Sequence, residues 1–313
     1  MIQYILRRTL SLLPFLLVVA VFASTLLRIM PGSPARRILG EYATEEAVAQ
    51  LEHELGLDKP LVTQIVSTLW NYIHGDFGIS LRNRRPVLKE IIDQLPFTVE
   101  LAIAGIIVAC FIGIPAGFVA ALKPNSFWDF LCRVIALLGI SMPVFWLGLL
   151  LIFGFCVRLR WFPSIGAGTH SDLGDLLQRL VLPSLAIGAN GAAIIMRMTR
   201  SCLLETLSED YIRTAYSKGL PSVRVYIIHA MRNAAIPLLT IIGLNFGYLL
   251  GGAVVTETIF SRPGIGKLII DAVLWRDYPV VQGCLLIFAI GIALTNLLVD
   301  ISYAFLDPRV RLE

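Results

Sequence analysis

Six long apolar stretches limit what this chain can fold into. They cover roughly residues 9–30, 97–122, 134–157, 181–199, 236–257 and 279–303. A helix of about 20 apolar residues crosses the hydrocarbon core of a bilayer and satisfies its own backbone hydrogen bonds there. We therefore predict an all-α, polytopic membrane protein with six transmembrane helices in the lipid bilayer. The fourth stretch is the least regular, because Pro183, Gly188 and Gly191 interrupt it.

The composition supports this class. The 313 residues are 57% hydrophobic and 15% charged, whereas soluble domains are about half apolar and a quarter charged. The net charge of +4 gives no reason to expect a nucleic-acid partner. The five cysteines are far apart and form no CxxC pair, so they predict neither a disulfide framework nor a metal site.

Basic residues in short loops predict the orientation. With the N-terminus in the cytoplasm, twice as many lysines and arginines fall in the inner segments as in the two short outer loops. Both termini and the polar loop formed by residues 200–235 are therefore expected on the cytoplasmic side. The first apolar stretch is too long for a cleaved signal, so we expect it to remain as a span.

The spans divide the chain into three parts. Residues 1–30 are expected to form an N-terminal transmembrane helix, 31–96 an extracytoplasmic helical lobe, and 97–313 a five-helix membrane core that includes the polar loop. Within the lobe, the pattern predicts a helix capped by Thr44, a second helix over about 60–74 and a third over 86–95. The lobe is either a structural cap or a docking platform for an outside partner.

Catalytic motifs are missing from the sequence. It contains no HExxH, no GxSxG and no grouping of histidines with carboxylates at metal-ligand spacing. The segment "SRPGIGKL" (261–268) is not a phosphate loop, because Ser261 replaces a required glycine and Leu268 the hydroxyl that binds Mg²⁺. Glu100 and Asp300 lie near span ends and do not indicate a proton relay. We predict a protein that is not an enzyme and binds no metal.

The polar loop contains the charged segment "DYIRTAYSKGLPSVRVYIIHAMRNAAIP" (210–237). Ser208 is placed to cap a helix with an apolar stripe at Leu207, Tyr211 and Ala215. Gly219 suits a left-handed C-cap, and Pro221 cannot continue the helix. A second helix is expected from Ser222, with Val225, Ile228 and Met231 on one face. The loop is longer than a connector needs, which favours a protein-binding protrusion over an incidental linker.

Two segments of the polar loop carry a family resemblance. "RTAYSKG" (213–219) and "HAMRNAAIP" (229–237) resemble the cytoplasmic coupling loop of binding-protein-dependent ABC importer permeases, in particular the dipeptide, oligopeptide and nickel class. Further motifs of that class follow in the expected order along nearly the whole chain, including "GISMPVFWLGLLL" (139–151), "PGIGKL" (263–268) and "RDYPVVQ" (276–282). Ser33 departs from the class, where many members have Asp.

The resemblance implies a permease subunit in the bacterial cytoplasmic (inner) membrane. Its expected partners are a second homologous permease subunit, two cytoplasmic ABC ATPase subunits and an extracytoplasmic solute-binding protein. No cofactor is expected in this chain, since ATP and Mg would be bound by the ATPases. The residues expected to couple to the ATPase are Asp210, Arg213, Thr214, Ala215, Lys218 and Gly219. Candidates for lining the translocation path, with helix packing as the alternative role, are Met142, Phe145, Trp146, Asn190 and Asn245.

The resemblance leaves the solute open among dipeptides, oligopeptides, glutathione, opines and chelated nickel. We expect an importer of short peptides or a similar small solute. The main alternative is a secondary transporter or channel that works without an ATPase, which would need buried ionisable groups in its spans. An intramembrane enzyme would need a paired nucleophile and base, and a scaffold protein would make the polar loop incidental.

Overall fold

The computed structural model describes residues 2–29, 34–40, 43–54, 58–168 and 171–306. The predicted boundary at residues 30 and 31, and Ser33, lie outside these ranges. Within them the chain is helical, apart from loops and one isolated antiparallel bridge between Ile79 and Pro86. The predicted all-α class is thereby confirmed.

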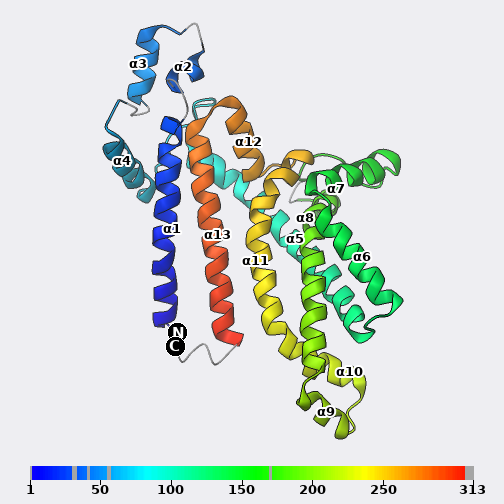
Figure 1. Ribbon diagram of the computed structural model, residues 1–313. Helices are drawn as coiled ribbons and strands as arrows, with labels where there is room; N and C mark the ends of the chain where they lie inside the picture. The colour runs from blue at the N-terminus through cyan, green and yellow to red at the C-terminus, as the bar shows by residue number, and fades with distance from the viewer. Residues whose placement is uncertain (1, 30–33, 41–42, 55–57, 169–170, 307–313) are drawn as a thin grey trace.

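Five long helices form the body of the molecule (Figure 1). They are α1 (Ile2–Ile29), α5 (Val87–Leu122), α8 (Leu173–Leu207), α11 (Met231–Ile259) and α13 (Tyr278–Leu306). The shorter helices gather at its two ends and its edge. They are α2 (Pro34–Leu39), α3 (Glu45–Glu54), α4 (Leu61–Ile73), α6 (Phe127–Ser141), α7 (Val144–Leu151) with the π-helix Ile152–Arg158, α9 (Asp210–Ser217), α10 (Ser222–Arg224) with the π-helix Val225–Ala230, and α12 (Ile265–Trp275).

In the part of the chain that the structure describes, four helices are long and apolar enough to cross a membrane. They are α5, α8, Pro237–Ile259 of α11 and Tyr278–Val299 of α13, which match four of the six predicted stretches. The apolar part of α1 is shorter, Thr9–Thr25. The total of six spans therefore stays a prediction.

The stretch predicted as one span over 134–157 is instead broken. Helix α6 and the segment Val144–Arg158 meet at an angle of 104°. Pro143 lacks the N–H that would continue the helical hydrogen bonds, and its ring disfavours the helical conformation for the residue before it. Met142 accordingly has φ −80° and ψ 125°, in the extended region. The apolar pattern could not show this bend, because both arms are equally apolar.

The predicted lobe helix over 86–95 is the first part of a longer helix. Helix α5 begins after Pro86, as expected, but continues through Pro96 to Leu122 without a break. The other two predicted lobe helices are present as α3 and α4, and the Thr44 hydroxyl accepts a hydrogen bond from the Ala47 N–H at 3.3 Å. The lobe is therefore continuous with the second span.

Among the described residues, the most extensive contact between two helices is the one between α5 and α8. Gly105, Ala109, Gly113 and Gly117 recur every four residues on α5 and are all buried. A Cβ atom on Gly113 would come within 2.5 Å of the Ala192 carbonyl oxygen, and one on Gly117 would approach that of Met196 equally closely. Small residues at this spacing let two membrane helices pack backbone against backbone.

This contact predicts the effect of adding one methyl group. We expect Gly113→Ala to lower the free energy of unfolding by about 1–3 kcal/mol, because the methyl overpacks a main-chain contact. Gly251→Ala is the matched control, since a Cβ there meets no atom within 4 Å. Thermal unfolding of the two purified variants in detergent tests this, and equal midpoints would contradict the close-contact account.

Candidate functional site

The polar loop is a folded unit that protrudes from one end of the molecule (Figure 1). Helix α9 follows α8 directly, and α10 with its π-helix leads into α11. A shared apolar core joins these elements to the end of α5: Ala121, Cys202, Leu203, Ile212, Ala215, Val225, Ala230 and Ala234. The loop is thus attached to three long helices and does not behave as a loose linker.

The end of α9 has the geometry that the sequence predicted. Gly219 has φ +76°, in the left-handed region. Its N–H donates to the Tyr216 carbonyl at 2.9 Å, and the Leu220 N–H donates to the Ala215 carbonyl at 3.3 Å. This pair of bonds is the Schellman motif, and Leu220 completes it by packing against the apolar core. The turn after α9 is therefore well defined.

The start of α9 differs from the prediction. Ser208 does not cap it, because its hydroxyl donates back to the Glu205 carbonyl at the end of α8, at 2.7 Å. Glu209 stands at the N-cap position without a side-chain cap bond. The turn between α8 and α9 is so short that Ser208 belongs to the end of the preceding helix.

The predicted apolar stripes are partly wrong. On α9, Ile212 is buried with Ala215, whereas Tyr211 is exposed and accepts a hydrogen bond from the Asn233 amide at 2.6 Å. After α10, Val225 and Ala230 are buried and Ile228 is exposed. The two buried residues are five positions apart because the segment is a π-helix, whose turn is wider than that of an α-helix. A period of 3.6 residues does not predict this spacing.

Five of the six predicted coupling residues lie on the outward side of this unit. Asp210, Arg213, Thr214, Lys218 and Gly219 are exposed, whereas Ala215 is buried. The Asp210 and Arg213 side chains are 95% and 80% exposed and lie 3.5 Å apart. Such an exposed pair adds little to stability, so both charges are available to a partner.

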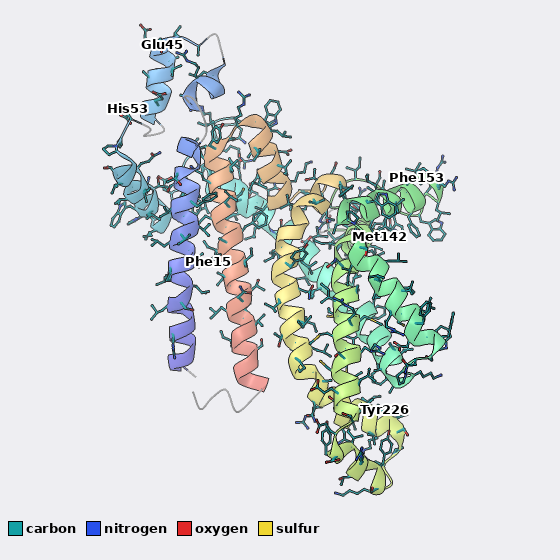
Figure 2. The ribbon with its side chains drawn as sticks, in the orientation of Figure 1. Phe15, Glu45, His53, Met142, Phe153 and Tyr226 are labelled. Carbon is teal, nitrogen blue, oxygen red and sulfur yellow. The ribbon has the colours of Figure 1, made fainter. Side chains whose placement is uncertain are left out.

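Tyrosines line the side of the same unit. Figure 2 shows Tyr226 next to the turn of the polar loop. Its hydrogen bond with Tyr216, together with burial, raises the pKa of Tyr226. The Tyr226 phenol therefore stays neutral at physiological pH, and the charged groups of α9 are those at its exposed surface.

The candidate path residues divide between two places. Met142 is at the bend between α6 and α7 (Figure 2), and Phe145 and Trp146 are exposed on α7. Asn190 on α8 and Asn245 on α11 belong to helices that pack against each other. Asn245 is buried, and its amide donates to the Ile241 carbonyl of its own helix at 2.8 Å.

A buried polar cluster, missed by the sequence analysis, lies at the end of the spans opposite the polar loop. Glu257 and Arg262 are fully buried. Thr98 donates to the Glu257 carboxylate at 2.7 Å, and Arg262 contacts Glu100 at 2.8 Å. Glu100, which the sequence placed near a span end, therefore pairs with the corner between α11 and α12.

The segment "PGIGKL" surrounds one of these carboxylates. The Lys267 N–H donates to Glu257 at 3.0 Å, and the Ile265 N–H donates to the Thr98 hydroxyl at 2.8 Å. A Cβ on Gly264 would overlap the Glu257 carboxylate, so glycine is required there. The first turn of α12 thus binds a carboxyl group at the place where helix N-termini bind anions, and that group is a side chain of the same protein.

A second buried ion pair joins α6 to α8 near the polar loop. Asp129 is fully buried and accepts hydrogen bonds from Arg200 at 2.7 and 2.9 Å. The Asn125 N–H donates to the same carboxylate at 2.9 Å. Among the described residues, no group of three histidine, cysteine or acidic side chains could hold a metal ion.

Comparisons with known proteins identify the class. Residues 113–312 match the family model described as binding-protein-dependent transport system inner membrane component, and residues 1–102 match the model for its N-terminal part. The fold resembles that of the MetNI methionine ABC transporter in an inward-facing conformation, with a TM-score of 0.58 at 16% identity, covering 69% of this chain and 96% of that one. The protein is a membrane permease, and it belongs to the binding-protein-dependent transport system inner membrane component family.

Two curated relatives match along almost the full length. The dipeptide transport system permease protein DppB of Alkalihalophilus pseudofirmus is 42% identical, over 99% of this chain and 100% of its own. The glutathione transport system permease protein GsiC of Escherichia coli strain K12 is 42% identical, over 99% of both chains. The prediction of an ABC importer permease, without enzymatic activity of its own, is confirmed.

Membership of this family also establishes the location of the chain and the general kinds of partner it has. The chain is a multi-pass protein of the inner membrane, and it works with a partner permease, ATPase subunits and a binding protein.

The buried polar cluster predicts a specific stability effect. Thr98→Val leaves the Glu257 carboxylate and the Ile265 N–H each without one partner, which should cost about 1–3 kcal/mol of unfolding free energy. Thr258→Val is the control, because that exposed hydroxyl bonds only within its own helix, to the Val254 carbonyl. Thermal unfolding of both variants in detergent makes the comparison, and an unchanged Thr98→Val midpoint would contradict the role given to Thr98.

Proposed function

We propose that this chain forms part of the path through which short peptides, or a similar small solute, enter the cell. An extracytoplasmic binding protein delivers the solute, and two separate cytoplasmic ATPase subunits supply the energy. ATP and Mg belong to those subunits, and a second, homologous permease completes the path. The full-length similarity to permeases named for dipeptide and glutathione transport is the observation that carries this proposal.

The polar loop is the proposed contact with the ATPase. Its exposed residues Asp210, Arg213, Lys218 and Gly219 present charge and an open backbone turn at the tip of a unit with its own apolar core. Ala215 has a different role, because its buried methyl group holds α9 against the bundle. A rigid unit fixed to α5, α8 and α11 passes a displacement on to the spans, whereas a flexible linker absorbs it.

The proposed orientation places both termini in the cytoplasm. The first turn of α1 and the last turn of α13 lie at the end of the molecule that carries α9 (Figure 1). The lobe helices α2 and α3 lie at the opposite end, as does α12. The excess of basic residues in the segments at the first end supports a cytoplasmic position for it.

The left-handed turn after α9 tests the ATPase contact. We expect Gly219→Val to weaken ATPase binding roughly 5- to 30-fold, because a left-handed conformation costs an ordinary residue about 1–2 kcal/mol. A Cβ at this position meets no atom within 4 Å, so the change acts through the backbone alone. The measurement is co-purification of the ATPase subunits with the tagged chain from detergent, together with solute uptake per ATP hydrolysed.

Two control variants accompany this test. Gly219→Asn keeps a residue that tolerates the left-handed region, so it should retain both binding and coupling. Gly40→Val introduces the same kind of strain at φ +91° in the lobe, again with no atom within 4 Å, and should retain ATPase binding. Normal coupling in Gly219→Val, or equal losses in both valine variants, would contradict the proposed contact.

The solute class calls for a separate measurement. Cells that depend on this importer should take up labelled dipeptides and tripeptides, glutathione included, and should lose that uptake when the chain is deleted. Free amino acids should not compete. Loss of nickel-chelate uptake with unchanged peptide uptake would assign a different solute, and transport by the reconstituted chain without any ATPase would favour the alternative of a secondary transporter or channel.

A further inference from the structure

Helix α4 exposes an apolar stripe that the protein itself does not cover. Val62, Val66, Trp70 and Ile73 are between 60% and 79% exposed. Their spacing of four, four and three residues places them on one face of the helix. The opposite side contacts the protein, where Gln64 is buried. Large apolar side chains gathered in this way mark a contact surface.

A second exposed stripe on α4 is polar. It consists of Thr63, Ser67 and Asn71, which are exposed. Each of them directly follows a residue of the apolar stripe in the sequence, so the two stripes lie side by side on the helix. The helix Leu61–Ile73 contains no charged residue. It therefore presents one side to the protein, one apolar side and one uncharged polar side. Helices that lie in the interface of a bilayer likewise combine an apolar and a polar face.

The position of α4 indicates what covers the apolar stripe. Helix α4 packs against α1, and Figure 1 shows it beside the end of α1 that leads to α2, at the edge of the molecule. Helix α1 exposes Leu17, Val18 and Phe22, and its apolar stretch ends at Thr25. The exposed stripe of α4 thus extends the apolar surface of a membrane helix at the level where that surface gives way to polar sequence.

The Trp70 side chain suits a position at the boundary between the acyl chains and the headgroups of a bilayer. Its indole ring lies 4.5 Å from the ring of His74, at the polar end of the helix. Tryptophan is enriched where acyl chains meet headgroups, because it combines a large apolar ring with one N–H donor.

We propose that α4 lies in the outer interface of the bilayer, with Val62, Val66, Trp70 and Ile73 immersed in lipid. The stripe of Thr63, Ser67 and Asn71 then faces the headgroups and water. Helix α4 holds the lobe at a set height above the spans, so that α2 and α3 project away from the membrane. The inference depends on the membrane position of α1 and is independent of the solute and of the ATPase contact.

Quenching of Trp70 fluorescence by brominated lipids tests this placement. The full chain, with the subunits that accompany it, is embedded in nanodiscs that carry bromine either near the headgroup end or near the terminus of the acyl chains. Subtracting the spectrum of Trp70→Phe from that of the wild type isolates Trp70, because the chain's other four tryptophans and those of the other subunits cancel. We expect blue-shifted emission that shallow bromines quench at least twofold more than deep ones.

A matched variant moves the probe by one position. In Trp70→Phe/Asn71→Trp the indole lies on the polar stripe, and we expect little quenching and red-shifted emission. Three results would overturn the proposal. Unquenched red emission from Trp70 means that water covers the stripe, unquenched blue emission means that a protein such as the binding protein covers it, and stronger quenching by deep bromines places α4 inside the hydrocarbon.

Discussion

The backbone contact between α5 and α8 is the constraint on which the rest of the structure depends. Glycine and alanine every four residues on α5 bring its main chain against the carbonyl groups of α8, and helix pairs of this kind derive their stability in lipid from close packing. Helix α8 is also the most buried of the four apolar spans, and it contacts α6, α7 and α11 besides α5. Its final residues enter the core of the polar loop.

Buried polar contacts at both ends extend this arrangement to the remaining helices. Glu257 and Thr98 join α11 and the start of α12 to α5 at one end, and Asp129 joins α6 to α8 at the other. Breaking one member of such a pair leaves an uncompensated buried group, which is strongly destabilising. The helices that approach the polar loop are therefore held by small-residue packing, by a buried ion pair and by buried hydrogen bonds, and a displacement of α9 acts on several of them together.

The sequence predicted features whose cause is local. Four apolar spans, the cap at Thr44 and the left-handed conformation of Gly219 each follow from residues that are close together in the sequence. The features that the sequence did not predict depend on residues far apart in the chain or on the geometry of the helices. Glu257 and Thr98 lie far apart in the chain, the π-helix shifts the helical period, and apolar residues on both sides of Pro143 hide the bend. The fourth stretch looked irregular partly because two of the residues that interrupt it, Gly188 and Gly191, are small residues that pack against α5.

The polar loop separates two kinds of residue that a motif alone does not distinguish. Ala215 and Ile212 face inward and determine whether α9 is held in place, whereas Arg213 and Lys218 face outward and carry its charge. A larger side chain at Ala215 would disturb the apolar core that α9 shares with α5, α8 and α11. It would affect the binding of a partner only through that core. A change of charge at Lys218 would leave that core intact. The small and the charged positions of "RTAYSKG" therefore contribute to coupling by different physical routes, one through the shape of the loop and one through its surface.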